Sequence, residues 1–179
     1  MAGLLRFASG MDQVSRFFAW IAAWLVLLSC LISAGNAVSR YAFSLSSNAW
    51  LEIQWQMFAG IFLLAAPWVF KVNEHVRVDL FYGMASPRAK LWIDVVGIIF
   101  FLFPSTILMG IMSWSFFLAS FESGEMSMNA GGLPLWPVKG LLPLGMALMF
   151  LQGAAELVKR IAALRGQTDA MPEYERPLQ

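Results

Sequence analysis

The chain has 179 residues, of which 59% are hydrophobic and only 13% carry a charged side chain. A soluble domain has roughly 25% charged residues, so this composition excludes an ordinary soluble protein and indicates one built for a lipid bilayer. The net charge is +1 and the basic residues form no stripe, which excludes a nucleic-acid-binding surface. The single cysteine excludes an intramolecular disulfide and a metal cluster made of thiolates from this chain alone.

Four uncharged apolar intervals lie along the chain, each close to the roughly 20 residues that cross a bilayer as a helix. With their interfacial ends included, the predicted spans cover residues 17–39, 50–70, 91–120 and 136–157. The third span is the longest and contains Pro104, which predicts a tilt or kink there. The fold class is therefore predicted as all-α integral membrane, with residues 17–160 forming a transmembrane domain of four helices.

The distribution of lysine and arginine predicts how the spans are oriented. With the N-terminus inside, ten of the twelve basic residues fall on the cytoplasmic side, and only Arg40 and Lys139 fall on the outer side. Cytoplasmic connections carry the excess of lysine and arginine, so both termini are expected in the cytoplasm. Residues 1–16 are then a cytoplasmic N-terminal segment, and residues 161–179 are a cytoplasmic polar tail.

The stretch KVNEHVRVDL, residues 71–80, concentrates charge between two apolar spans and holds the only histidine of the chain. His75 and Asp79 are four residues apart, so a metal site or a proton relay is conceivable if the stretch is helical. Two ligands do not complete a zinc site, however, and no second histidine exists. We therefore interpret Glu74, His75, Arg77 and Asp79 as a cytoplasmic hairpin that sets the topology and leads into the third span.

Polar residues also flank the outer connection between the first two spans. Asn36 and Arg40 share a helix face, and so do Glu52 and Gln56. An arginine and a carboxylate on either side of a short connection can pair and fix how two helices meet. An ion-coupling or substrate site is the alternative, but such a site is expected nearer mid-membrane on a broken helix. We predict that these four residues form a helix clamp or a subunit interface.

The remaining charged residues offer little chemistry. Asp94 opens the third span as a charge on the cytoplasmic rim, and Glu122 with Glu125 lies in the outer loop without a base nearby. The sequence contains no phosphate-binding glycine loop, no nucleophile elbow and no haem attachment motif. We predict a protein that is not an enzyme and has no catalytic, cofactor-binding or metal-ligating residues.

Several stretches in order along the chain resemble one family. They are NAVSRYAF, WLEIQWQMF, NEHVRVDLF and SGEMSMNAGGLPLWPVKGLLPLGMALMFLQGAAEL. Together they resemble the small membrane subunit of tripartite ATP-independent periplasmic (TRAP) transporters, the DctQ family, from about Phe17 to Arg160. The fourth-span region looks most like the branch labelled mannitol or chloroaromatic-compound transport.

The resemblance implies a function that depends on partners. In this family a large permease subunit of about a dozen spans carries the transport path, and a periplasmic solute-binding protein captures a carboxylate-containing solute. The small subunit braces the immobile scaffold of the permease in the bacterial inner membrane. The matching positions of this chain lie at the proposed clamp and in the cytoplasmic hairpin, and none is implied to bind sodium or solute.

Two other functions remain open on the sequence alone. A tetraspan redox subunit would bind haem or quinone, although one histidine cannot supply bis-histidine ligation. A small proton-coupled exporter would use Glu52 as its titrating carboxylate, although that residue lies at the edge of a span. The expected function is the small subunit of an ion-gradient-driven transporter.

Overall fold

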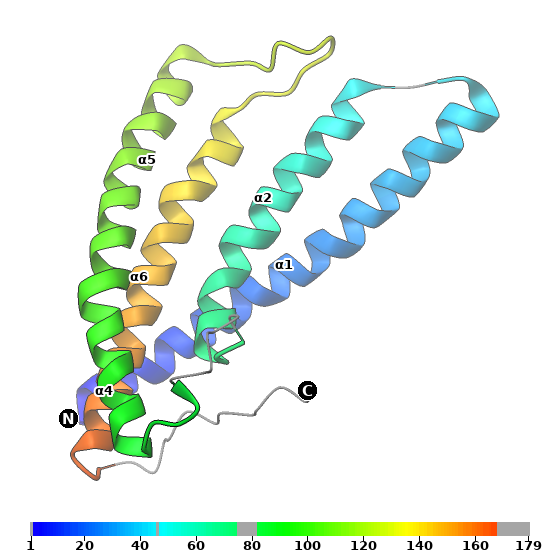
Figure 1. The fold of residues 1–179 in the computed structure, drawn as a ribbon. Coiled ribbons are helices and arrows are strands. Elements are labelled where there is room, and N and C mark those ends of the chain that lie inside the picture. The colour runs from blue at the N-terminus through cyan, green and yellow to red at the C-terminus, as the bar shows by residue number, and fades with distance from the viewer. Residues whose placement is uncertain (1, 46, 75–81, 168–179) are drawn as a thin grey trace.

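The structure is a computed structural model that describes residues 2–45, 47–74 and 82–167. In these ranges the helical elements are α1 (Ala2–Phe43), α2 (Asn48–Lys71), α4 (Pro87–Gly97), the π-helical turn η1 (Ile98–Leu102), α5 (Phe103–Ser123) and α6 (Trp136–Leu164). Because α4, η1 and α5 follow without a break, the described residues form four long helices, each long and apolar enough to cross a membrane (Figure 1). This confirms the predicted all-α fold with four membrane-crossing helices.

The helices form a bundle that is tight at one end and spread at the other (Figure 1). The start of α1, the end of α2, the start of α4 and the end of α6 lie together at what we call the terminal end. The opposite end, called the loop end, holds the turn between α1 and α2 and the longer connection between α5 and α6. α6 contacts α1, α2, α4 and α5, so it is the central helix of the bundle.

α1 begins well before the predicted first span. The first proline of the chain is Pro67, so nothing in the N-terminal segment interrupts helical hydrogen bonding, and α1 is continuous from Ala2. Its first turns pack on α6 through a small cluster of Ala8, Met11 and Ala155. The helical bundle thus includes the N-terminal segment as well as the residues of the predicted first span.

The centre of the bundle depends on close approach between helices. Ala22, Leu64 and Leu148 form the buried cluster between α1, α2 and α6. A Cβ atom on Gly145 would lie 3.0 Å from Leu63 Cβ and 3.2 Å from the Leu63 carbonyl oxygen. Small residues let helix backbones approach in membranes, where packing contributes most of the association between helices. Gly145 therefore sets the distance at which α2 and α6 cross.

The third membrane-crossing helix contains a π-helical turn directly before Pro104. The amide of Phe103 bonds to the carbonyl of Ile98, which makes this turn one residue wider than an α-helical turn. Proline has no N–H and crowds the preceding turn, so a local change of helix type next to Pro104 has a direct cause. Thr106 Oγ1 donates to the Leu102 carbonyl at 2.7 Å and supports the turn.

Candidate functional site

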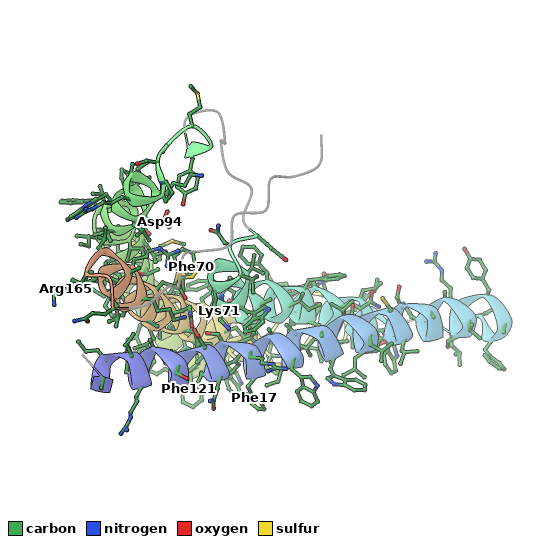
Figure 2. All side chains as sticks on the ribbon, turned by 90° about the horizontal axis from the view of Figure 1, so that it is seen from below. Phe17, Phe70, Lys71, Asp94, Phe121 and Arg165 are labelled. Carbon is green, nitrogen blue, oxygen red and sulfur yellow. The ribbon has the colours of Figure 1, made fainter. Side chains whose placement is uncertain are left out.

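Charged and polar side chains from four helices meet at the terminal end of the bundle. We call them the terminal cluster: Asp12 and Ser15 of α1, Lys71 of α2, Tyr82, Asp94 of α4, and Gln152, Glu156, Lys159 and Arg160 of α6. Figure 2 views the molecule from this end, with Lys71 and Asp94 labelled near the end of α6. The cluster brings together parts of the chain that are up to 148 residues apart in number, from residue 12 to residue 160.

Asp12 is the anchor of α1 in this cluster. Lys159 Nζ donates to both of its carboxylate oxygens, at 2.6 and 2.7 Å. Gln152 Nε2 donates to Asp12 Oδ1 at 3.0 Å, and Lys71 Nζ lies 3.8 Å from Asp12 Oδ2. One carboxylate therefore ties α1 to α2 and to α6.

Arg160 forms the second half of the cluster, and its side chain is only 4% exposed. Its Nε donates to Asp94 Oδ2 at 2.8 Å, and its Nη1 contacts Glu156 one turn earlier. The Tyr82 hydroxyl donates to the other oxygen of Asp94 at 3.2 Å. Lys159 also donates to Glu156, at 2.7 Å, so the Asp12 half and the Arg160 half form one continuous network.

Gln152 joins the helices from the centre of the network and is completely buried. Its side-chain oxygen accepts from Ser15 Oγ at 2.7 Å, and its amide nitrogen donates to Asp12 and, at 3.2 Å, to Glu156. Both functions of the amide are therefore used, as a buried polar group requires.

The ionised members of the terminal cluster balance one another. Three carboxylates (Asp12, Asp94, Glu156) face three cations (Lys71, Lys159, Arg160). Removing one partner of a buried pair leaves an uncompensated charge and is strongly destabilising, whereas the intact pair adds little net stability over apolar packing. The six charges therefore favour one arrangement of the helices, because few other arrangements would neutralise all of them.

The sequence produces this cluster through helical spacing and through the lengths of the apolar intervals. Gln152, Glu156 and Arg160 are four residues apart and therefore lie on one face of α6. Lys71 ends the second apolar interval, and Asp94 precedes the third. Because the helices run side by side across a similar depth, the charges that end these intervals meet.

A second polar group lies at the loop end and is built around Glu52, which is 2% exposed. Its carboxylate accepts from Asn129 Nδ2 and from the backbone N–H of Leu133, both at 2.7 Å, and from the Ser127 hydroxyl. One turn later, Gln56 Nε2 donates to the Pro134 carbonyl at 3.3 Å. We call this group the loop clamp, because it attaches the connection between α5 and α6 to the first turns of α2.

The connection held by the loop clamp is also stabilised by hydrogen bonds within its own backbone. Gly124 has φ 60°, a left-handed conformation that ends α5. The Ser127 N–H donates to the Leu133 carbonyl at 2.9 Å, and the Leu135 N–H donates to the Glu125 carbonyl at 3.0 Å. The connection is thus a narrow hairpin whose inner side faces α2.

An ion pair supports the same connection where α6 begins. Lys139 pairs with Glu125, and the Lys139 ammonium also lies 4.0 Å from the centre of the Phe116 ring. The hydrogen bond from Lys139 holds the pKa of the Glu125 carboxyl below its ordinary value. Since this pKa is lowered on folding, the pair contributes its stability at neutral pH, and that contribution is lost in acid as the carboxyl becomes protonated.

The predicted clamp residues are only partly brought together. Glu52 and Gln56 both bind the connection between α5 and α6, which sequence reasoning did not indicate as their partner. The suggested pairing of Glu52 with Arg40 is not found: the loop donors occupy the Glu52 carboxylate, and Arg40 is exposed without an ion pair in the described part of the chain. Asn36 Oδ1 is shielded from solvent and has no hydrogen-bond partner among the described residues.

The predicted cytoplasmic hairpin is described only at its start. Glu74 is exposed, and its backbone N–H donates to the Val69 carbonyl at 3.2 Å. His75, Arg77 and Asp79 lie outside the described residues, so their predicted roles stay predictions.

Sequence reasoning missed most of the terminal cluster. Asp12 lay outside the predicted first span, and Gln152 lay inside an apolar stretch. The available signal was the polar spacing of four along α6 within an otherwise apolar helix, since a polar face at membrane depth must face protein. Asp94, taken as a charge on the rim, is instead only 7% exposed in its side chain and paired with Arg160.

Metal ligands and hollows determine which ions or small molecules the described residues could bind. In residues 2–45, 47–74 and 82–167, no group of three or more His, Cys, Asp or Glu side chains could hold a metal ion. Two hollows of about 780 Å³ flank α6. The first is lined by apolar residues such as Phe101 and also borders Asp94 and Arg160 of the terminal cluster. The second is lined almost entirely by apolar residues such as Trp114 and Leu144, and such walls suit lipid chains or apolar side chains.

The fold and both polar groups define a multi-pass helical membrane protein. The sequence profile of the DctQ component of tripartite ATP-independent periplasmic transporters matches residues 29–163, about three quarters of the chain. The chain belongs to this family, as the order of its motifs predicts. No curated protein and no solved structure gives a significant match. The matched region contains the loop clamp and all of the terminal cluster except Asp12 and Ser15, which precede it.

Proposed function

We propose that this chain, as the small membrane subunit of a TRAP transporter, braces the scaffold of the large permease subunit. Transport would be driven by an ion gradient, and the solutes would contain carboxylate groups. Membership of the DctQ family supports the role as a transporter component rather than an enzyme. The large permease and a periplasmic solute-binding protein are the partners that a tripartite transporter of this family requires.

The observation that carries the bracing role is the terminal cluster. A brace must keep its shape while a neighbouring domain moves, and the cluster ties α1, α2, α4 and α6 through mutually neutralised charges. A rearrangement of these helices would separate buried charges, which is costly in a membrane. The bundle is therefore suited to stay fixed rather than to cycle between two states.

The proposed location is the bacterial inner membrane, with both termini in the cytoplasm. Support comes from the described basic residues at the terminal end, which are Arg6, Arg16, Lys71, Arg88, Lys90, Lys159, Arg160 and Arg165. The loop end has only Arg40 and Lys139 among its described residues. This asymmetry favours a cytoplasmic terminal end by the positive-inside rule.

A reversible lock on the bundle tests the bracing role. Ala8 of α1 and Ala155 of α6 are buried in the same cluster, so Ala8→Cys with Ala155→Cys places one thiol on each helix for cross-linking, after Cys30→Ser removes the native thiol. The complete transporter carrying this variant is reconstituted in liposomes, and solute uptake is measured before and after oxidation. Because a brace does not rearrange during transport, we expect the oxidised and reduced transporters to have the same uptake rate.

The reduced sample of the same variant is the matched control, because it differs only by the cross-link. Uptake that is lost on oxidation and restored by a reducing agent would show that α1 and α6 must move, contrary to the proposal. Liposomes that contain this chain alone should show no uptake. Robust uptake by the chain alone would favour the small exporter over the transporter subunit.

A further inference from the structure

Arg40 has no acidic partner in the described structure. It lies in the last turn of α1 and is exposed. Of the acidic residues at the loop end, Glu52 accepts three hydrogen bonds from the loop and Glu125 pairs with Lys139. The third, Glu122 near the end of α5, makes no ion pair with Arg40 or with another described residue. Lys139 is the other basic residue of the loop end, so Arg40 is the unpaired cation there among the described residues.

The helix around Arg40 is an unusually open part of the bundle. The last buried residue of α1 is Ser29, and we call the remainder of the helix, residues 30–43, the α1 tip. Figure 1 shows it leaving α6 and α5 and continuing beside α2 toward the loop end. Val38, Tyr41 and Phe43 are 61%, 85% and 69% exposed. The α1 tip thus carries a positive charge that is unpaired among the described residues, and it exposes large apolar side chains.

We propose that the α1 tip docks against a membrane-spanning helix of the large permease subunit, and that this helix presents an aspartate or glutamate to Arg40. This inference rests on the proposed function, because it names the surface through which the brace contacts its partner. Charge complementarity selects the partner: a planar guanidinium binds a carboxylate through two parallel hydrogen bonds. At the edge of the hydrocarbon region such a pair is stronger than in water and fixes the register of two helices.

The apolar side chains of the α1 tip would supply the surface that is buried in the same contact. Helices in membranes associate through packing rather than through a hydrophobic driving force. Tyr41 supplies a ring that can pack and a hydroxyl that can bond across an interface. The expected contact therefore has one charged pair, with apolar packing beside it from Phe43, which lies three residues further along the same side of α1.

Charge reversal tests the pair. Arg40→Glu is expressed together with the large permease subunit, and the amount of that subunit which co-purifies in lipid-depleted detergent is measured. We expect at least about a tenfold loss of affinity, which corresponds to about 1.4 kcal/mol. Changing one acidic residue at an outer helix end of the large subunit to arginine should restore co-purification. Because Arg40 makes no ion pair with the residues that the structure describes, thermal unfolding of the isolated small subunit should not change.

Arg165→Glu is the matched control, since Arg165 is also exposed and makes no ion pair with a described residue, but lies just beyond α6 at the terminal end. It should co-purify with the large subunit as the unaltered chain does. Normal co-purification of Arg40→Glu, or an equal loss with Arg165→Glu, would overturn the inference. The unaltered chain separates the two proposals: if it does not bind the large subunit at all, the proposed function is wrong as well.

Photo-crosslinking distinguishes a protein partner from lipid. Benzoylphenylalanine is placed at Tyr41 and, as a control of similar exposure, at Met112 of α5, which is 65% exposed. After illumination of membranes that contain the complex, position 41 should give an adduct with the large subunit. Adducts of position 41 with phospholipid only would show that the α1 tip faces lipid and would overturn the inference. Equal protein adducts from both positions would also contradict it.

Discussion

At the scale of single residues, Asp12 shows how much depends on a charge outside the apolar spans. Its carboxylate accepts from Lys159 and Gln152 and lies near Lys71. The two side chains of the Asp12–Lys159 pair are 22% and 21% exposed, so water screens the pair only in part. The pair therefore lies between a surface salt bridge, which contributes little, and a fully buried one.

A double-mutant cycle at this pair should reveal strong coupling. Asp12→Asn leaves Lys159 and Lys71 short of one negative charge, and we expect the free energy of unfolding to fall by about 1–2 kcal/mol. Lys159→Met should cost a similar amount, because it leaves Asp12 with a weaker set of donors. The double variant should lose clearly less than the sum of the two, since neither charge is then left alone. Thermal unfolding in detergent measures all four proteins.

Glu122→Gln provides the control for this cycle. Glu122 is exposed near the end of α5 and makes no ion pair with the residues that the structure describes, so its neutralisation should change the free energy of unfolding by less than about 0.5 kcal/mol. Additive effects of Asp12→Asn and Lys159→Met would contradict the view that the two residues act as one pair.

Glu52 separates a transporter subunit from a proton-coupled exporter. Glu52→Gln replaces an acceptor-only carboxylate by an amide, so the donors of Ser127, Asn129 and Leu133 cannot all be satisfied. Hydrogen bonds to a charged group contribute about 1.5–3 kcal/mol, so the amide of Leu133 should exchange with deuterium at least about tenfold faster. In the subunit interpretation the assembled transporter keeps its uptake and only assembly weakens. An exporter that uses Glu52 as its proton site would lose all activity.

At the scale of elements, α6 decides where the other helices lie. Its glycines allow neighbouring helices to pack closely: Leu63 of α2 lies against Gly145, and Leu102 of η1 lies against Gly153. Its polar face holds the terminal cluster, and its first turns receive the hairpin from α5. α1, by contrast, is held along its first part and is free of α6 toward its end (Figure 1). The same bundle is thus tied at one end and open at the other.

Gly145→Ala should push α2 away from α6. The added methyl group would lie 3.0 Å from Leu63 Cβ and 3.2 Å from a backbone oxygen, which cannot move without displacing α2. Overpacking of this kind costs about 1–3 kcal/mol, so the unfolding temperature in detergent should fall. Gly35→Ala is the control within α1, because its added Cβ would meet no atom within 4 Å apart from its chain neighbours and the local backbone of its own helix. That variant should be neutral or more stable by up to about 1 kcal/mol. Equal effects of the two substitutions would disprove the close crossing.

At the scale of the whole molecule, two polar groups hold two ends of one apolar bundle. The terminal cluster connects four helices through charges, and the loop clamp connects α2 to the hairpin before α6. Between them lie mainly apolar packing and close helix contacts, with a surface of large hydrophobic side chains that requires lipid or a partner subunit to cover it. This architecture gives a small transporter subunit a defined shape.

Much of this architecture could be predicted from the pattern of apolar residues. The four membrane-crossing helices follow from interval length, because each must satisfy its own backbone inside the bilayer. The membership of the family follows from the order of short motifs such as WLEIQWQMF, which the match to residues 29–163 confirms. Helix ends were harder to predict, since α1 begins at Ala2 where no residue stops a helix, well before the hydrophobic interval.

The sequence by itself determined the number of helices, their approximate positions and the charge asymmetry of their ends, because these depend on local composition and on the thickness of a bilayer. Only the tertiary structure decided which polar residues meet. Glu52 bonds to the hairpin of residues 124–135 rather than to Arg40, and Asp12 pairs with Lys159 across the whole chain. The partner of each polar residue depends on how the helices cross and on which donors then lie within hydrogen-bonding distance of each carboxylate. The spacing of residues along one helix determines neither.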